Sequence, residues 1–461
     1  MQNQNRIPGP AENKMGVMPV GKLLFTMALP MIVAMLVQAL YNVVDSIYVS
    51  RISESAVTAL SLAFPIQNLM IGFAVGLGVG VNSLLSKSLG QGDRQTADAT
   101  AGNGFFLICI ATALFVLFGI FGSRAYFAMQ SNVAETVDGG SIYITICCVS
   151  SLGIFVEILG ERLLQASGRT FYTMITQGTG AIVNILLDPV FIFGVDFLGI
   201  PAMGMAGAAI ATVIGQWVAA ALAVYFNLKH NPDIRFSLGI FRPRAAVIRP
   251  ILGVGVPSII MGSIGSVMTF GMNQILQGFH ETATGVFGIY FKLQSFFFMP
   301  VFGINNATIS IVAYNYGARK PQRISATLRR SCLSALCIMT VGLLIFLLLP
   351  DMLIGIFNPT DEFLRIGRSA LRIISLHFPL AAFGIALGAS FPALGNGIYS
   401  TITSLCRQLI ALLPAAYLLS LSGEVNRVWW SFPIAEVISL TVTILLFRRI
   451  YTRKVAPLLK Q

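Results

Sequence analysis

Long apolar stretches of about 20 residues recur along the whole chain, separated by short polar connections. A helix of that length crosses the roughly 30 Å hydrocarbon core of a bilayer, because it rises about 1.5 Å per residue. The stretches are continuous rather than alternating, which favours helices over the strands of a barrel. We therefore predict an all-α integral membrane fold of twelve transmembrane helices. They are expected at about 21–45, 56–82, 98–121, 139–161, 171–195, 206–228, 248–277, 284–311, 328–350, 368–391, 399–421 and 428–449.

The second half of the chain repeats the first at a constant spacing. Pro30 and Pro257 are 227 residues apart, and the same offset relates Gly90 to Gly317 at the end of the second span of each half. Because six helices preserve orientation, the halves are expected to be parallel repeats about an axis normal to the membrane, as in many carriers. The predicted units are an N-terminal lobe, a cytoplasmic linker and a C-terminal lobe, at residues 1–228, 229–247 and 248–461.

Composition agrees with a protein that faces lipid. The chain is 56% hydrophobic and 10% charged, with a mean hydropathy of +0.80. Its net charge of +12 raises the question of a nucleic-acid partner. However, 22 Lys and Arg residues fall in the segments of one side of the predicted topology and only six on the other. This asymmetry places both termini in the cytoplasm and excludes nucleic acid as the reason for the charge.

Two of the predicted spans carry polar stripes at helical spacing. The first span presents Gln38, Tyr41, Asn42 and Asp45 on one face, and the fifth presents Gln177, Asn184 and Asp188. Such stripes are costly against lipid, so both are expected to face the bundle interior, where the two helices would lie opposite each other.

The two carboxylates on these stripes suggest an ion-coupling site. In a low-dielectric cavity Asp45 and Asp188 can hold either a proton or a cation, and exchange of one for the other is a simple means of coupling. Sodium is the other candidate ion, because Asp45, Asn184 and Asp188 supply the hard oxygen ligands that it prefers. A purely structural cluster of buried polar groups is the alternative.

The second half does not repeat this chemistry, since Met272 and Ala415 stand at the positions equivalent to Asp45 and Asp188. Polar residues within the spans of both halves are candidates for a substrate cavity. They are Gln38, Gln67, Gln177, Asn273, Gln277, Lys292, Gln294 and Arg407.

Several other ionisable residues within the spans allow two interpretations. Lys292 and Arg407 either line the cavity or pair with an acid such as Glu436, and His377 is more readily a satisfied core histidine than a ligand. Glu157 and Glu161 end the fourth span beside Arg162, which suggests an interfacial ion pair and, less readily, a role in cation entry.

The chain resembles the multidrug and toxic compound extrusion (MATE) family over essentially its whole length. The resemblance is carried by the YNVVD stretch that ends at Asp45, the GQGD and GARK loops, and NILLDPVFIF in the fifth span. In the branch similar to DinF, an acid in helix one and an Asn and Asp in helix five form the cation site. Tyr41, Asp45, Asn184 and Asp188 match that pattern, and Thr212 matches its threonine in helix six.

The resemblance implies antiport, in which an inward proton or sodium gradient drives efflux of cationic, amphipathic compounds across the bacterial inner membrane. No cofactor other than the coupling ion is expected, and the expected partners are lipid and small molecules, with the protein a monomer. The branch similar to NorM places acids in helices seven and ten, where this chain has Asn273 and His377. The alternatives are a lipid-linked glycan flippase of the same superfamily and a membrane-embedded enzyme, for which the sequence offers no metal-spaced or nucleophile motif.

Overall fold

The computed structural model describes residues 13–195, 199–235, 242–279, 281–357 and 360–459. Within these ranges the regular structure is helical, apart from one isolated bridge between Val195 and Ile200. Ten helices are long and apolar enough to cross a membrane, and two further pairs of bent helices bring the number to as many as twelve. The predicted all-α membrane fold is confirmed.

The first half consists of a short N-terminal helix followed by six spans. Its helices are α1 (Lys14–Val17), α2 (Val20–Ser50), α3 (Glu54–Gln91), α4 (Arg94–Phe121), α5 (Ser123–Ala128), α6 (Ala134–Val149), α7 (Leu152–Ala166), α8 (Thr170–Phe193) and α9 (Met205–His230). The fourth span is the pair α6 and α7, which meet at an angle of 48°. The sequence predicted one continuous span there, and the break falls at Ser150 and Ser151, two residues that favour turns over helix interiors.

The second half repeats the order of long helices. Its helices are α10 (Ala245–Gln277), α11 (Glu281–Gly317), α12 (Pro321–Leu348), α13 (Pro350–Gly355), α14 (Asp361–Ser375), α15 (Phe378–Gly388), α16 (Ser390–Ala393), α17 (Gly397–Leu405), α18 (Leu413–Ser420), α19 (Val425–Val428) and α20 (Ser431–Ile450). Span ten bends by 45° between α14 and α15, just before Pro379. Span eleven contains a π-helical segment, η3 (Cys406–Leu412), and the chain ends in η4 (Tyr451–Val455) and η5 (Ala456–Leu459).

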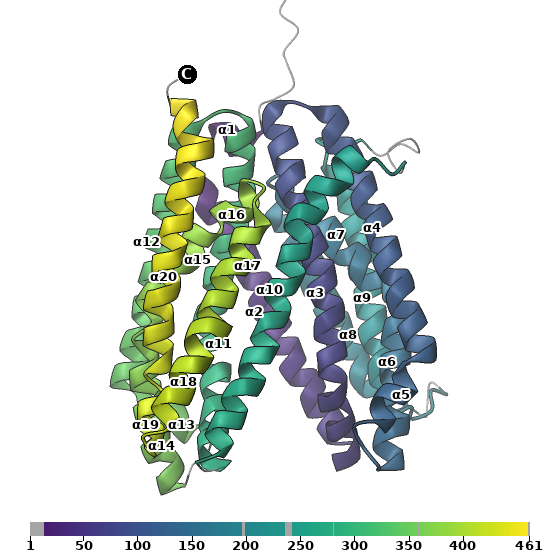
Figure 1. The fold of residues 1–461 in the computed structure, drawn as a ribbon. Coiled ribbons are helices and arrows are strands. Elements are labelled where there is room, and N and C mark those ends of the chain that lie inside the picture. The colour runs from purple at the N-terminus through teal and green to yellow at the C-terminus, as the bar shows by residue number, and fades with distance from the viewer. Residues whose placement is uncertain (1–12, 196–198, 236–241, 280, 358–359, 460–461) are drawn as a thin grey trace, which may run out of the picture.

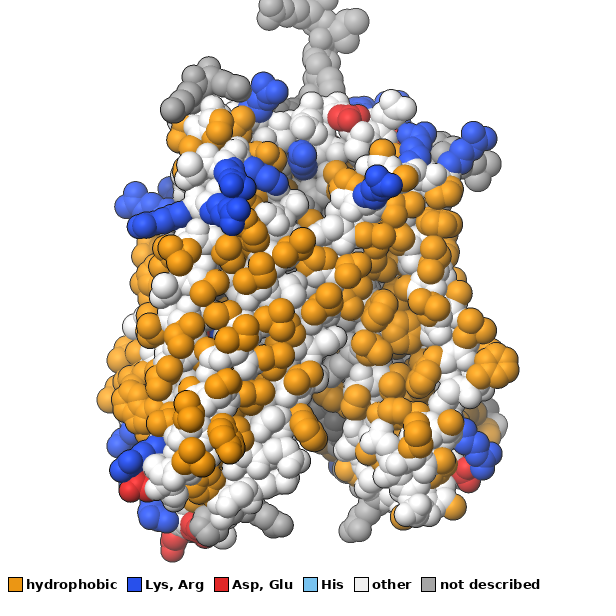
Figure 2. Space-filling model, in the orientation of Figure 1, with side chains coloured by type: hydrophobic (Ala, Val, Ile, Leu, Met, Phe, Trp, Pro, Cys, Tyr) orange, Lys and Arg blue, Asp and Glu red, His pale blue; other side chains and the backbone are white. Residues whose placement is uncertain are grey.

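The two halves converge at one end of the molecule and separate at the other. The first and last described segments, α1 and η5, lie at the same end, which we call the terminal face (Figure 1). In the space-filling view the halves are hollowed apart at the opposite face, whereas Lys and Arg side chains gather near the terminal face (Figure 2). Between the two faces the visible surface is a broad apolar belt (Figure 2).

Glycines allow the halves to approach closely where they converge. A side chain at Gly80 would collide with the backbone of Ile251, and one at Gly90 with the backbone of Tyr314. Gly76 of α3 also meets α10, where a side chain would collide with Ile259. Gly72 instead has open space beside it.

The connection between the halves runs from residue 231 to residue 244, inside the predicted linker of 229–247. Residues 236–241 of that linker lie outside the described residues. One buried apolar core lies mainly in the first half and extends to Val247 and Ile251 of α10, and another lies in the second half. A further buried cluster joins α1 and α2 to α11 across the boundary. The halves are therefore held together at one end only, which leaves room for a cavity between them.

Candidate functional site

A cavity of about 430 Å³ lies between the two halves. Its wall is formed by α2, α3, α7, α8 and α9 of the first half and by α10, α11, α15, α17 and α20 of the second, among other segments. Most of the wall is apolar, with a limited number of polar groups, as is usual for a small-molecule site. Its charged members among the described residues are Glu157, Glu161, Arg162, Arg407 and Glu436.

The predicted polar stripes of the first and fifth spans do face each other. Helix α2 packs against α8, and Gln177 Nε2 donates a hydrogen bond to Gln38 Oε1 at 3.3 Å. Both glutamines lie on the cavity wall, together with Tyr41. The side chain of Asn42, the other member of the first stripe, is outside the described residues. The helical periodicity of the sequence was therefore sufficient to identify both inward faces.

Asp45, Asn184, Asp188 and Thr212 form a compact buried group, which we call the coupling cluster. Asn184 Nδ2 donates to Asp188 Oδ1 and to Thr212 Oγ1, both at 3.3 Å, and the threonine hydroxyl donates to Ala208 O at 3.0 Å. Asp45 lies within electrostatic range of Asp188. The structure thus brings together side chains from α2, α8 and α9.

Three oxygens of the coupling cluster are left without a hydrogen-bond partner among the described residues. They are Asp45 Oδ1, Asn184 Oδ1 and Asp188 Oδ2, and Asp188 itself is fully buried. Unsatisfied buried acceptors are costly and therefore indicate a missing donor or cation. Among the described residues there is no group of three or more His, Cys, Asp and Glu side chains able to hold a metal ion. A cation here would consequently depend on amide and hydroxyl oxygens in addition to the two carboxylates.

Asp45 and Asp188 are not among the residues that line the cavity, although Tyr41, Asn184 and Thr212 are. Tyr41 lies within electrostatic range of both aspartates and of Glu157, so its ring stands near both the coupling cluster and the cavity acids. The sequence suggested that ion and cargo would share the same carboxylates in turn. The structure does not bring either aspartate to the cavity wall, and the shared use of these carboxylates stays a prediction.

The sequence did not indicate that Glu157 and Glu161 of α7 line the cavity. It favoured an ion pair with Arg162, but the described ion pairs do not include either glutamate. Arg162 donates to Gln165 Oε1 at 2.9 Å and to Asn306 Oδ1 of the opposite half at 3.3 Å. The signal that could have identified the acids is their spacing, because residues four apart share a helix face whereas adjacent residues do not.

The predicted cavity residues of the second half are distributed differently. Arg407 lies on the wall and also pairs with Glu436 at 4.0 Å, so both interpretations made from the sequence apply to it. Five other candidates do not line this cavity, and their role in substrate binding stays a prediction: Gln67, Asn273, Gln277, Lys292 and Gln294. Of these, Gln67 donates to the Tyr143 hydroxyl at 2.9 Å within the first half.

His377 behaves as a satisfied core residue. Its Nδ1 is 2.6 Å from Ile374 O, and its ring packs against Phe298, Phe378 and Phe432. The residue is buried, with a relative exposure of 6%. The preferred interpretation from the sequence, a core histidine rather than a ligand, agrees with this environment.

Curated relatives of similar length match nearly the whole chain. The multidrug export protein MepA of Staphylococcus saprophyticus is 23% identical over 412 residues, which are 89% of this chain and 90% of that protein. MepA of Staphylococcus aureus is 22% identical over 419 residues, covering 91% of each.

Solved structures share the fold. The crystal structure of a MATE protein in complex with MaL6 matches with a TM-score of 0.90 and 24% identity, over 98% of this chain and 100% of that one. A MOP superfamily transporter from Pyrococcus furiosus, whose binding pocket is described as having reverse polarity, matches at 25% identity and a TM-score of 0.89, over 98% and 99%.

The family description MatE matches twice, at residues 30–190 and 257–418, and these two segments begin at Pro30 and Pro257. The matches cover well over half of the chain and follow the internal repeat seen in the sequence. This membrane protein, with its two repeated helical halves around one cavity, therefore belongs to the MATE family of transporters.

Proposed function

We propose that this protein is a multidrug exporter that uses an inward proton or sodium gradient to drive the efflux of amphipathic cations by alternating access. The observation that carries the proposal is the coupling cluster, with three buried oxygens unpartnered beside a cavity between two repeated halves. Its relatives named as multidrug export proteins support the class of cargo.

The orientation follows from charge. Lys and Arg gather near the terminal face, so this face is assigned to the cytoplasm together with both termini, and the hollow between the halves opens outward. For a bacterial exporter the membrane is the inner membrane. A cargo released from the cavity in this state would leave on the outer side.

The carboxylates of the coupling cluster act as the ion acceptor in this proposal. When Asp45 and Asp188 lose the ion, their buried oxygens are uncompensated, which disfavours that state until a new proton or sodium ion arrives. Asn184 and Thr212 orient Asp188 through the hydrogen bonds described above. No further cofactor takes part.

Transport by purified protein in vesicles tests the proposal. Export of a fluorescent cationic dye is measured under a pH gradient and, separately, under a sodium gradient. Asp188→Asn is expected to abolish gradient-driven export with either ion, because the amide can neither take up a proton nor attract a cation. Full gradient-driven export by this variant would overturn the mechanism.

The flippase alternative receives less support from the cavity. A lipid-linked glycan carries phosphate groups and calls for a basic surface, but the described wall has three acids and two arginines, one of them paired with Glu436. The relatives are named as export proteins and not as enzymes, so catalysis is not proposed.

A further inference from the structure

The cavity wall of the first half carries two carboxylates that the coupling cluster does not include. Glu157 and Glu161 lie one helical turn apart on α7 and both line the cavity. Glu161 is buried and accepts a hydrogen bond from Thr176 Oγ1 of α8 at 3.1 Å.

Neither glutamate takes part in an ion pair among the described residues. Glu157 and Glu161 interact electrostatically with each other, and Arg162 acts on Glu161 without forming an ion pair with it. The Arg162 guanidinium is instead directed to Gln165 and Asn306. A cation in the cavity is a partner that both carboxyl groups lack, and it would offset the burial and the mutual repulsion that disfavour their ionised forms.

An independent feature of the wall also indicates a ligand. The hydroxyl of Thr173 is buried and has no hydrogen-bond partner among the described residues, and the residue is only 2% exposed. Thr173 lines the cavity and lies one turn before Thr176, the residue that contacts Glu161. Its unused hydroxyl is an acceptor on the same wall, one turn from the threonine that contacts Glu161.

This acidic site is separate from the coupling cluster. Thr176 and Asp188 are both on α8 and are twelve residues apart, which corresponds to about 18 Å along the helix axis. Glu161, which contacts Thr176, therefore lies near the start of α8, and Asp188 lies near its other end. The acids on the cavity wall and the acids of the cluster therefore need not hold the same ion.

We propose that Glu157, Glu161 and Thr173 form the subsite for the cationic group of the cargo, a single protonated amine or quaternary ammonium. The neighbouring Ile154, Ile158 and Met31 of the wall accommodate its apolar part. The subsite rests on the proposed export function. It assigns cargo recognition and ion coupling to different carboxylates, with Tyr41 in electrostatic range of both.

Binding of ethidium, a monocationic dye, to the purified full-length protein tests the subsite without any gradient. The double variant Glu157→Gln/Glu161→Gln is expected to raise the Kd by about tenfold or more, since a buried charge contact is lost. Asp138→Asn removes one exposed negative charge near the opposite face and serves as the matched control. The single variant Glu157→Asp keeps a carboxyl group and is expected to bind ethidium more tightly than the double variant does. A purely structural role of the glutamates would not predict this difference.

The outcomes separate the two proposals. An unchanged Kd in the double variant, with its thermal melting temperature preserved, overturns the subsite. Loss of dye binding in Asp188→Asn but not in the double variant overturns it as well, because the cargo would then sit at the coupling cluster. Loss of binding in the double variant with no gradient-driven export by the wild type leaves the subsite valid and overturns the proposed coupling.

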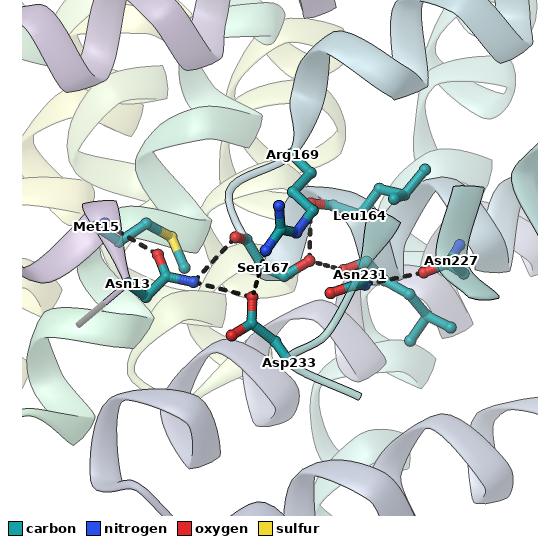
Figure 3. Close-up of polar contacts among 9 residues, drawn as sticks. Asn13, Met15, Leu164, Ser167, Arg169, Asn227, Asn231 and Asp233 are labelled. Atoms are coloured by element: carbon teal, nitrogen blue, oxygen red, sulfur yellow. Dashed lines mark hydrogen bonds and ion pairs between the residues drawn. The ribbon is translucent and has the colours of Figure 1, made fainter. Parts of the chain in front are cut away.

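A second, independent feature is the N-terminal segment, which contacts both halves at the terminal face. Asn13 Nδ2 donates to Ser167 O at 3.0 Å and to Asp233 Oδ2 at 3.3 Å, and Asp233 also pairs with Arg169 (Figure 3). These contacts fasten the start of α1 to the first half. Asn13 also caps the helix through the Met15 amide.

The other end of α1 is fastened to the second half. Arg323 donates to Met15 O at 3.0 Å and to Met18 O at 2.6 Å, and Asn315 Nδ2 donates to Met15 O at 3.1 Å. The Met15 side chain is fully buried in the apolar cluster that includes residues of α11. Hydrogen bonds thus run from one short segment to both halves.

We propose that α1 is a releasable brace that keeps the terminal face closed while the opposite face is open. Opening of the terminal face requires the halves to move apart there, so the contacts to one half must break first. The side-chain contacts of Asn13 are fewer than those that hold Met15 and Met18. Release is therefore assigned to the Asn13 and Asp233 side.

Distances between spin labels on α7 and α12 at the terminal face test the brace by electron paramagnetic resonance. Asn13→Ala and Asp233→Ala are expected to increase the fraction of long distances, and Asp138→Asn, far from α1, is the control. Unchanged distance distributions in both variants would overturn the brace. A shift in the control of the same size would also do so, since the effect would not depend on α1.

Discussion

The two halves share a scaffold and differ in where they place charge. In the first half, Asp45 and Asp188 are buried with unpartnered oxygens, and α8 is a continuous helix. In the second half, Met272 is equivalent to Asp45 and is fully buried in an apolar core. The span that corresponds to α8 is interrupted by the π-helix η3. Duplication therefore accounts for the architecture, whereas the proposed ion chemistry depends on a few residues in one copy.

An acid introduced at the equivalent position of the second half tests whether that half tolerates a buried carboxyl group. Met272→Asp places an acid in an apolar core without the Asn and Thr partners of the coupling cluster, and should destabilise the protein by about 3 kcal/mol. The measurement is thermal unfolding in detergent. Met272→Leu, which keeps the volume and adds no charge, is the control. Equal stability of Met272→Asp and Met272→Leu would show that the second half tolerates the same chemistry.

The glycine contacts should show that the packing of the halves, unlike their chemistry, is shared. Gly76 lies against Ile259, and its equivalent Gly303 lies against Ile32. Alanine at either position is expected to cost roughly 1–3 kcal/mol, because the added methyl group overpacks the contact. Gly72→Ala is the matched control, since nothing lies within reach of its methyl group. Similar losses at Gly72 and Gly76 would contradict the packing argument.

The smallest expected effect concerns the loops after the second span of each half. Asp93 caps α4 by accepting a hydrogen bond from the Thr96 amide at 3.0 Å, whereas Lys320 at the start of α12 makes no such side-chain bond. Asp93→Ala should therefore cost about 1 kcal/mol. Lys320→Ala would also remove the bond that Lys320 Nζ donates to Gly16 O at 3.1 Å, so Gln95→Ala, an exposed change in the first turn of α4, is the control. An equal loss of stability in Gln95→Ala would contradict the role of Asp93 as a cap.

Low pH should weaken the hydrogen bond by which Asp93 caps α4. Hydrogen bonds from Thr96 hold the pKa of Asp93 below its ordinary value. A group whose pKa is lowered by folding stabilises the protein at pH values above the pKa that the group has in the unfolded chain. This stabilisation is lost as the pH falls through the pKa of the folded state. The stability difference between wild type and Asp93→Ala should accordingly shrink below about pH 4, which unfolding measured across pH can check.

The helical spacing of polar residues predicted much of the site. It identified the faces of α2 and α8 that meet through Gln38 and Gln177, and the resemblance to the family placed Thr212 beside Asn184. The spacing of residues along one helix did not reveal which neighbouring helix packs against each of its faces. Glu157 is among the residues that line the cavity and Asp188 is not, a difference that the spacing did not predict.

Other features depended on contacts between distant segments. The pairing of Arg162 with Asn306 joins residues 144 positions apart, and the contacts of Met15 with Asn315 join residues 300 apart. No local pattern encodes such distances. The bend between α6 and α7 was also missed, because the apolar residues on both sides of Ser150 and Ser151 form one continuous stretch, although serine favours turns.

The proline that follows Asp188 has a mechanical consequence. Pro189 lies inside α8 and has no N–H, so it cannot bond to the carbonyl of Ile185 one turn earlier. The last turn of this helix can therefore tilt away from the rest without breaking a backbone bond at that point. Arrival or departure of an ion at Asp188 would act where the helix is least stiff, and a small local event could be converted there into movement of a larger segment.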